Sequence, residues 1–311
     1  MKTLVIGGTG HIGQFLTQML LDDGQEVLVQ SSGRTAVPTA VSSRVKYAVL
    51  DYTASLRNGA FLALLQAEKP TAVVDILQGD SAGVAHACKQ AGVTQLVACG
   101  SVWMFGRPKV VPTPAVAQTA CPFDGYQRRY TEMLQVLAQA PRDGLAFTAI
   151  MPPNICGPGK IPLEGHGGRS LEVHRAHQRG VEVILPDPGT PLVGPCDAED
   201  VAQAFFLAVK HPEAAGEIYN VGSAYALTAE RFVRTYGDIY GTPIPVRYVS
   251  PETYVRDVLP DLGANFHFLE HMCPDISRPV LRLGYAPRYT PEQTMERAVR
   301  WMFEQKLLAP K

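Results

Sequence analysis

A glycine-rich stretch near the amino terminus, residues 7–13 with the sequence Gly-Gly-Thr-Gly-His-Ile-Gly, has the spacing of a phosphate-binding loop. It follows an apolar run at residues 2–6, and from Ile12 onward apolar residues recur every three or four positions, as in a helix. In such a strand–loop–helix unit, Gly7 permits a tight turn, Gly10 lets the backbone approach a pyrophosphate, and Gly13 allows close helix–strand packing. The N–H groups and the positive dipole end of the helix then face the phosphates. The stretch predicts a dinucleotide site, with contacts from Gly7, Thr9, Gly10, His11, Ile12 and Gly13.

The end of the second predicted strand, residues 26–30, indicates which dinucleotide is bound. A site for NAD usually carries a carboxylate there, which binds the ribose hydroxyls. Here the strand runs into Ser31, Ser32, Gly33 and Arg34 instead. Hydroxyls and a guanidinium can hold a 2′-phosphate, whereas a carboxylate would repel it. We therefore predict NADP, bound by Ser31, Ser32 and Arg34, with NAD as the alternative and a solvated loop arginine as the competing interpretation of Arg34.

Strands and helices alternate through the first half of the chain and must position these residues. Strands are predicted at residues 2–6, 26–30, 45–50, 72–77, 95–99 and 146–150, and helices from residue 12 and at 56–67, 81–90 and 128–139. This alternation predicts an α/β fold of the Rossmann type, with a doubly wound parallel sheet. Ligands of such sheets bind beyond the carboxyl ends of the strands. One crevice should therefore be surrounded by Gly7, Ser31, Asp51, Leu77, Ser101 and Met151.

The character of the chain changes after Pro152, where prolines and glycines become frequent. A helix at 198–209 and a strand at 217–221 should return to the sheet, and further helices are predicted at 228–240 and 291–305. We expect a dinucleotide-binding domain at residues 1–155, completed by about 197–222. A smaller, discontinuous C-terminal substrate-binding region is expected at residues 156–196 and 223–311.

The composition excludes several classes of protein. The chain has 311 residues, 46% of them hydrophobic and 18% charged, and its net charge of −1 gives no support for bulk binding to nucleic acid or membrane surfaces. No apolar run approaches the roughly 18 residues that a membrane helix needs. The cysteines are scattered without a Cys-x-x-Cys pair, so neither a metal site nor a disulfide framework is predicted. We expect a reduced, cytoplasmic setting, and a homodimer is compatible with the sequence, which does not determine the oligomeric state.

Six motifs together make the sequence similar to the extended short-chain dehydrogenase/reductase superfamily, the NAD(P)-dependent epimerases and dehydratases. The resemblance covers nearly the whole chain, and the motifs occur in the order that the family has. They are residues 7–13 (G-G-T-G-x-I-G in the family), 100–106 (S-S-x-x-V-Y-G), 152–159 (P-x-N-V-Y-G-P-G, after an arginine that is Met151 here), 198–202 (V-x-D-V-A), 216–222 (G-x-x-Y-N-V-G) and 275–287 (D-x-S-K…L-G-W-x-P). The resemblance implies a nucleotide-binding fold and chemistry at a carbinol or ketone carbon.

The resemblance also implies a Tyr-x-x-x-Lys pair on a helix and a Ser or Thr that binds the same substrate oxygen. Ser101 fits the hydroxyl role. If the pattern is aligned with Tyr126 as its tyrosine, which makes Tyr126 the expected acid, the lysine position four residues later holds Tyr130. In a second alignment, Asp124 takes the tyrosine position and Arg128 takes the lysine position. Neither alignment has both the tyrosine and the lysine, so the catalytic pair is disrupted. Tyr126 and Tyr130 could instead be a packing pair on one helix face.

Further cofactor contacts are implied at three strand ends and on one helix. Asp51 would lie beside the adenine, although a helix N-cap is equally compatible with its position. Leu77 and Pro152 would line the crevice, and the charge of Arg128 could hold the nicotinamide ribose.

Substrate contacts are implied for Asn154, which belongs to the third motif. Nucleotide-sugar enzymes of the family usually carry an arginine before Asp200, where Val193 stands at about that position. A UDP- or dTDP-linked sugar is therefore disfavoured, although Arg169, Arg175 or Arg179 could compensate. His166 lies in a glycine-rich loop and could serve as an acid or base near neutral pH; a solvated loop histidine is the competing interpretation.

These observations predict an NADP(H)-dependent oxidoreductase or epimerase that acts on a small polar substrate, sugar-like compounds included. The disrupted Tyr-Lys pair leaves a rival hypothesis. Some atypical members of the superfamily keep the nucleotide fold and act as cofactor-gated regulatory or RNA-binding proteins. The net charge of −1 argues against a strong RNA site.

Overall fold

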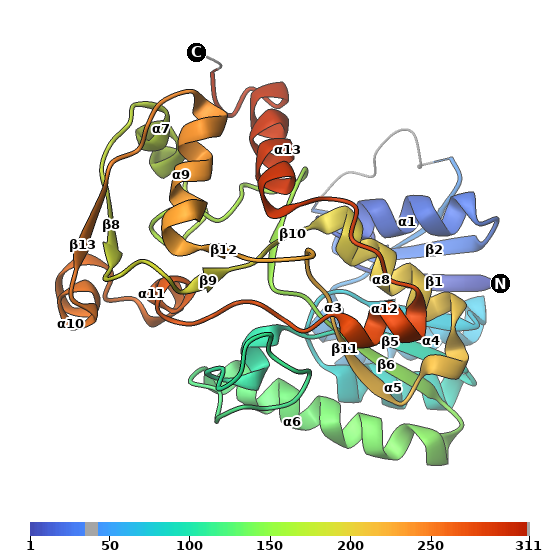
Figure 1. The fold of residues 1–311 in the computed structure, drawn as a ribbon. Coiled ribbons are helices and arrows are strands. Elements are labelled where there is room, and N and C mark those ends of the chain that lie inside the picture. The colour runs from blue at the N-terminus through green and yellow to red at the C-terminus, as the bar shows by residue number, and fades with distance from the viewer. Residues whose placement is uncertain (35–42, 310–311) are drawn as a thin grey trace.

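The computed structural model describes residues 1–34 and 43–309, and its centre is a sheet of seven strands (Figure 1). In spatial order the strands are β11 (Glu217–Asn220), β6 (Ala146–Met151), β5 (Gln95–Cys99), β4 (Ala72–Asp75), β1 (Lys2–Ile6), β2 (Glu26–Ser31) and β3 (Lys46–Val49). Every neighbouring pair in this sheet is parallel. The predicted α/β fold with a doubly wound, Rossmann-type sheet is confirmed.

Alternate residues of the strands enter two cores, one on each face of the sheet. Leu4 and Ile6 of β1 belong to the first core, whereas Val5 between them belongs to the second. Helices α4 (Ala60–Glu68), α5 (Ser81–Ala91) and α6 (Asp124–Gln139) contribute to the first core, and α1 (Gly13–Asp22) and α8 (Ala198–Lys210) to the second. Because both faces are buried, the central strands read as continuous apolar runs rather than as alternating ones.

Two helices differ from the sequence prediction. The segment 56–67 belongs to two helices, α3 (Tyr52–Asn58) and α4, because Gly59 between them adopts a left-handed φ of 81°. Helix α6 begins at Asp124 and not at residue 128. Tyr126 therefore lies in the first turn of a regular helix instead of in the preceding loop.

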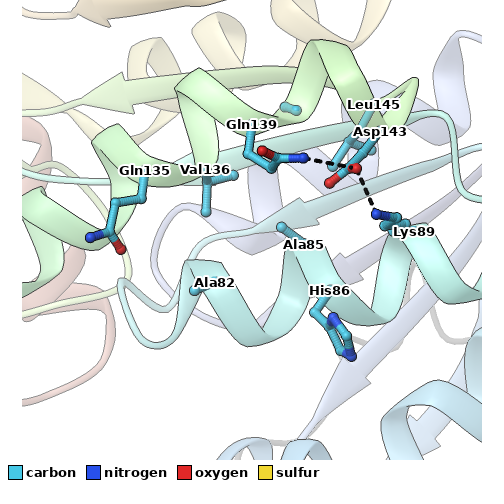
Figure 2. A pocket seen from close by; sticks show the side chains of 10 residues that line it. Ala82, Ala85, His86, Lys89, Gln135, Val136, Gln139, Asp143 and Leu145 are labelled. Atoms are coloured by element: carbon cyan, nitrogen blue, oxygen red, sulfur yellow. Dashed lines mark hydrogen bonds and ion pairs between the residues drawn. The ribbon is translucent and has the colours of Figure 1, made fainter.

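Helices α5 and α6 lie side by side, and a pocket of about 300 Å³ lies between them (Figure 2). At one end of it, Lys89 Nζ and Gln139 Nε2 both donate to Asp143 Oδ1, at 2.6 and 3.1 Å. The bond from Lys89, followed by that from Gln139, holds the pKa of Asp143 below its ordinary value. No residue of the glycine loop lines this pocket, so it is separate from the crevice at the strand ends.

The second region is built from short strand pairs and helices and lies to the left of the sheet in Figure 1. Its strand pairs are β10 (Pro195–Asp197) with β7 (Asn154–Cys156), β12 (Leu227–Thr228) with β9 (Leu192–Val193), and β13 (Val246–Val249) with β8 (Val183–Pro186). Its helices are α7 (Leu171–Gln178), α9 (Ala229–Tyr240), α10 (Pro251–Thr253), α11 (Leu262–Leu269) and α13 (Pro291–Glu304). A third core joins these elements with residues from 156–193 and 227–308.

One part of the segment 223–311 packs elsewhere. Helix α12 (Ser277–Leu283) and its flanks place Met272 in the first core of the sheet, and Leu283 and Tyr285 in the second. Tyr285 Oη also donates to Gly222 O at 2.8 Å. The stretch around α12 is thus attached to the dinucleotide-binding fold, within a segment that we expected to belong to the substrate region. No helix of the described residues is long and apolar enough to span a bilayer.

Candidate active site

The loop between β1 and α1 folds tightly back on itself. Gly7 has a left-handed φ of 82°, its N–H donates to Gln30 O at 2.9 Å, and its carbonyl accepts from Gly10 N at 2.9 Å. Gly13 has no room for a side chain, because a Cβ there would lie 2.2 Å from Gly7 O. No side chain caps the amino-terminal end of α1, which leaves that end of the helix open to an anion. The cradle fits a pyrophosphate.

A cavity of about 470 Å³ joins this loop to the ends of neighbouring strands. It brings together distant parts of the chain: the glycine loop, the segments after β4, β5 and β6, the first turn of α6, the loop after β7, and α11. The predicted site residues that line it are Gly7, Gly10, His11, Ile12, Leu77, Ser101, Tyr126, Pro152, Asn154 and Arg169. Thr9 and Gly13 belong to the loop but do not line the cavity.

The residues predicted to select NADP lie at and after the end of β2, outside the walls of this cavity. Ser31 Oγ shares a hydrogen bond with Tyr47 Oη (2.8 Å) and accepts from Gly33 N (3.1 Å). Ser32 and Arg34 are exposed. These contacts shape the turn after β2 and leave the Arg34 side chain open to solvent.

Two other predicted residues also lie away from the cavity walls. Asp51 is the N-cap of α3, where its Oδ1 accepts from Ala54 N at 2.8 Å, which matches one of the two interpretations of this residue. His166 is exposed, and its N–H donates to Glu164 Oε2 at 2.5 Å. The structure therefore does not bring the His166 loop to the cavity.

Ser101 lies directly after β5 and is 8% exposed. Its Oγ accepts a hydrogen bond from Trp103 N at 3.3 Å and caps the 3₁₀ turn Val102–Phe105. A hydroxyl that accepts one hydrogen bond keeps its own proton to donate. Ser101 can thus donate to an oxygen inside the cavity.

Tyr126 is the residue of α6 that lines the cavity. No hydrogen bond engages its hydroxyl in the described part of the chain. Burial raises the pKa of Tyr126 above the ordinary value, and the Arg129 guanidinium, 5.9 Å from the ring centroid, opposes that rise. The phenol therefore keeps its proton at neutral pH and can act as an acid.

The other candidates on α6 lie on different surfaces. Tyr130 is 4% exposed and packs edge-on against Phe105, with ring centroids 5.6 Å apart. Arg128 is exposed and lines a separate pocket, and its Nε lies 3.8 Å from Glu132 Oε1. Asp124 is the first residue of the helix. None of these residues lines the cavity, so the only group of α6 in the lining is the phenol of Tyr126, and the nearby Arg129 guanidinium stays outside it.

Two cations from the second region lie in the cavity wall, and no carboxylate is among its lining residues. Arg169 is fixed by two backbone carbonyls, with Nη1 donating to Ile161 O (2.7 Å) and Nη2 to Ile155 O (2.8 Å). Desolvation lowers the pKa of Arg169 and of Lys160, and the charge of Arg169 lowers the pKa of Lys160 further. Paired cations of this kind suit phosphate groups.

His11 connects the glycine loop to the second region. Its Nε2 lies 3.2 Å from Gly157 O, and Gln14 Nε2 donates to Pro158 O at 3.4 Å. Burial, and then the charge of Arg169, lower the pKa of His11 to about 4. His11 is therefore neutral at physiological pH and holds the loop after β7 beside the end of α1.

Seven residues of the lining were not among the predicted site residues. Three of them are apolar, Ile76, Pro153 and Ile155, and the other four are Gln78, Trp103, Lys160 and His267. Gln78 adopts a left-handed φ of 54°, and its Nε2 donates to Gly100 O at 2.6 Å. The rings of Trp103 and His267 lie 4.6 Å apart although they come from distant segments. The second motif already contained Trp103, at a position that the family pattern leaves open. Gln78 and Lys160 carry no signal in the spacing or periodicity of the sequence. His267 stands four residues before His271, a helical spacing that by itself suggests at most a metal site.

The histidines of α7 serve the third core. His174 is bonded at both ring nitrogens, with Nε2 3.2 Å from Pro162 O and Nδ1 3.0 Å from Tyr240 Oη. His177 Nε2 accepts from Gly165 N at 3.2 Å. Across residues 1–34 and 43–309, no group of three or more His, Cys, Asp or Glu side chains could hold a metal ion.

Asp75 at the end of β4 organises the turn that brings Leu77 to the cavity. Its Oδ1 accepts from Leu77 N (2.9 Å) and its Oδ2 from Tyr52 Oη (2.7 Å), and Tyr52 Oη in turn accepts from Asp80 N (2.8 Å). Burial raises the pKa of Asp75 to about 6 in spite of these donors. The network keeps this wall of the cavity in place through one buried carboxyl group.

Tyr52→Phe is expected to lower the free energy of unfolding by about 1–3 kcal/mol, because it leaves a buried carboxylate short of a donor. The pKa of Asp75 in the folded protein lies above its ordinary value of 3.8, so its contribution to stability is greatest below about pH 4 and is lost as pH rises through about 6. Removing the Tyr52 donor raises this pKa further. Urea unfolding should therefore show a larger loss at pH 8 than at pH 5. An equal loss at both pH values, or the same pH dependence in an Asp75→Asn background, would contradict this role.

Comparison with known proteins gives one family match and several relatives. The family described as NAD dependent epimerase/dehydratase matches residues 3–222. UDP-glucose 4-epimerase of Streptomyces lividans is 26% identical over 273 residues, covering 78% of this chain and 82% of the relative. The chloroplast stem-loop binding protein of 41 kDa b of Arabidopsis thaliana is 21% identical over 304 residues, covering 93% of this chain and 75% of the relative.

Solved structures agree in fold over the whole chain. UDP-glucose-4-epimerase from Stenotrophomonas maltophila, with bound NAD and formylated UDP-arabinopyranose, superposes with a TM-score of 0.76 at 20% identity and covers 99% of both chains. At this identity the likeness concerns the fold alone. The family match spans most of the chain and includes the glycine loop and the strand ends that line the cavity. The chain therefore belongs to the NAD-dependent epimerase/dehydratase family and is an enzyme of the extended short-chain dehydrogenase/reductase type.

Proposed function

We propose that this enzyme is an NADP(H)-dependent oxidoreductase or epimerase that acts on a carbinol or ketone carbon of a small polar substrate. The observation that carries the proposal is the shared cavity. Gly7 and Gly10 line it together with Ser101 and Tyr126, whose hydroxyls are both free to donate. Because two donors remain beside the glycine loop, we favour catalysis over a purely regulatory or RNA-binding role.

The chemistry follows from these two hydroxyls. A bound nicotinamide would supply or accept a hydride at the reacting carbon. Ser101 would donate a hydrogen bond to the substrate oxygen, and Tyr126 would give that oxygen its proton during reduction of a ketone. Donors aimed at an oxygen that becomes negative stabilise the transition state more than the ground state. We assign the positive charge of the site to Lys160 and Arg169 rather than to Arg128, which is exposed and paired with Glu132.

The NADP preference is supported by the residues after β2. Arg34→Ala is expected to raise the Kd for NADPH about 10- to 100-fold, the effect of losing a hydrogen bond to a charged group. The Kd for NADH should stay nearly unchanged, since NADH has no 2′-phosphate. Fluorescence titration with each dinucleotide measures both values. Arg57→Ala, an exposed arginine of α3, is the matched control, and an equal loss of NADH and NADPH affinity would remove Arg34 from the phosphate site.

We further propose that the substrate carries no nucleotide, although the relative from Streptomyces lividans is named for UDP-glucose. Val193, at about the position of the diphosphate-binding arginine, is fully buried and pairs with Leu227 in the third core. That segment therefore has no cation to offer a diphosphate. Asn154 and Arg169, which line the cavity, are the proposed substrate contacts. Arg169 belongs to the proposed substrate region of residues 156–196 and 223–311, from which the stretch around α12 departs, and Asn154 lies just before that region.

The test is hydride transfer. Purified protein is assayed with NADPH and NADH against ketones, free sugars and UDP-sugars, and interconversion of UDP-glucose and UDP-galactose is followed separately. Reduction of a small ketone or sugar with NADPH would support the proposal. Tight dinucleotide binding without turnover on this panel would favour the regulatory alternative, and absence of dinucleotide binding would refute the proposal.

A further inference from the structure

Three lining residues of the cavity differ in character from the glycine loop. The aromatic ring of Trp103 lies 4.6 Å from that of His267, and His267 and Asn154 each carry a buried nitrogen without a hydrogen-bond partner. We propose that Trp103 and His267 recognise an uncharged, hydroxylated ring, so that free sugars or cyclitols are the substrate class of this enzyme. This inference rests on the proposed function and names the substrate for the same site.

His267 is the first of the supporting observations. It lies on α11, is 9% exposed, and lines the cavity. Its Nδ1 is buried without a hydrogen-bond partner, and no hydrogen bond reaches either ring nitrogen in the described part of the chain. His174, also buried, is in contrast bonded at both nitrogens. Since an unmade hydrogen bond of a buried polar group is unfavourable, the His267 ring points to a ligand that completes it.

The charge state of His267 restricts that ligand. Burial, followed by the charge of Arg169, lowers the pKa of His267 to about 3, so the ring is neutral at physiological pH. A neutral imidazole offers one donor and one acceptor, which is the pattern that a hydroxyl group complements. It offers no charge to a carboxylate or an amine.

Asn154 adds a second unpartnered polar side chain to the lining of the cavity. It is 7% exposed, and its Nδ2 is buried without a partner. It begins β7, next to Pro153 and Ile155, which also line the cavity. Two unpartnered polar side chains in the lining of one cavity match a ligand with several hydroxyls better than one with a single carbonyl.

Trp103 supplies the flat surface. Its ring is stacked on Phe123 (centroids 5.1 Å apart, 18° between planes) and lies 5.2 Å from Phe266 and 6.2 Å from Tyr126. These neighbours hold the indole in one orientation beside the ring of Tyr126. The C–H face of a saturated ring packs on such an aromatic surface while its hydroxyls remain at the edge. The reacting carbinol or ketone would then lie near Ser101 and Tyr126.

The charges of the cavity narrow the class further. With no carboxylate in the lining, an amino-sugar would find no counter-charge there. Lys160 and Arg169 both lower the pKa of His11, and Arg169 also lowers the pKa of His267, so the charge of Arg169 reaches both residues. The Arg169 guanidinium is already held by Ile155 O and Ile161 O, whereas the unpartnered side chains of Asn154 and His267 are neutral. A neutral ring alcohol or its ketone fits what remains.

The chain offers a direct readout, because it has two tryptophans, Trp103 and Trp301. Trp301 packs against the third core and does not line the cavity. In a Trp301→Phe protein, the fluorescence of Trp103 should change saturably with D-glucose or with myo-inositol, and the two titrations distinguish sugar from cyclitol. Cyclohexanone and UDP-glucose serve as the apolar and the nucleotide-linked comparisons.

His267→Ala in the same protein should weaken ring binding about tenfold, the loss of one neutral hydrogen bond, and leave the Kd for NADPH unchanged. His267→Gln, which keeps a donor and an acceptor, should recover part of the affinity and stands in if the alanine variant does not fold. His86→Ala, an exposed histidine of α5, is the control. Tighter binding of cyclohexanone or UDP-glucose than of either polyol, or unchanged polyol binding in both His267 variants, would overturn the inference. Binding is read without turnover, so failure of hydride transfer alone would count against the proposed function and not against this recognition site.

Discussion

Tyr126→Phe is expected to lower kcat for hydride transfer about 100- to 10,000-fold, the range that a positioned general acid contributes. The variant removes one oxygen and keeps the ring, whose edge-on contacts with Trp103 and Phe123 hold it in the cavity wall. No hydrogen bond engages the hydroxyl in the described residues, so the folded protein should lose no internal bond. The Kd for NADPH and the urea unfolding curve should therefore match those of the unmodified protein.

Tyr130→Phe is the matched control for that experiment. It makes the same substitution one helical turn further along α6, but Tyr130 lies in the core against Phe105 and does not line the cavity. Its kcat should stay close to that of the unmodified enzyme. If Tyr126→Phe retained full turnover, or if the two variants lost activity equally, Tyr126 would not be the acid.

The rates of ketone reduction and of alcohol oxidation should depend differently on pH, because the two directions need different protonation states of Tyr126. Burial holds the pKa of Tyr126 above its ordinary value of 10.0, so the phenol is protonated at pH 7 and the phenolate is scarce. Ketone reduction, which needs the acid form, should be insensitive to this group from pH 6 to 9. Alcohol oxidation, which needs the base form, should increase with pH throughout that range. The increase should disappear in Tyr126→Phe.

Gly13→Ala should have the second large effect, on stability and cofactor binding together. A Cβ at this position would lie 2.2 Å from Gly7 O, 2.6 Å from Gly8 Cα and 2.7 Å from Gly8 C. All three atoms are backbone, so no side chain can move aside, and the loop or the start of α1 must shift. We expect a loss of about 3 kcal/mol in the free energy of unfolding, at the upper end of overpacking effects.

The same shift would disturb the cradle for the pyrophosphate. The affinity for NADPH should fall at least about tenfold, since displaced N–H groups lose their geometry toward the phosphates. Gly125→Ala provides the comparison: Gly125 lies in the first turn of α6, and an added Cβ there meets no atom within 4 Å. Because alanine is the better helix former, that variant should be neutral or slightly stabilised. Normal stability and NADPH binding in Gly13→Ala would exclude the close packing described for the loop.

Much of the fold could be predicted because its signals are local. The strand periods, the glycine spacing of residues 7–13 and the order of the motifs need no knowledge of distant contacts, and the α/β fold and family that they indicated are confirmed. Helix ends were less certain. Gly59 divides one predicted helix in two, and α6 begins before the residue expected. The exact ends of a helix depend on the backbone angles of individual residues, which the spacing of apolar residues does not predict.

The sequence by itself determined that a phosphate-binding loop opens a doubly wound sheet, since each of those features lies within a few consecutive residues. Only the tertiary structure decided what faces the far end of the cavity. Tyr126 and Tyr130 are one turn apart on nearly the same helix face, and the packing of α6 places one in the cavity wall and the other in the core. Lys160 and His267 join Tyr126 from segments far along the chain. The spacing of residues in the sequence predicts which side chains are neighbours within one helix or strand. A site built from several elements depends on how those elements pack together, which spacing does not show.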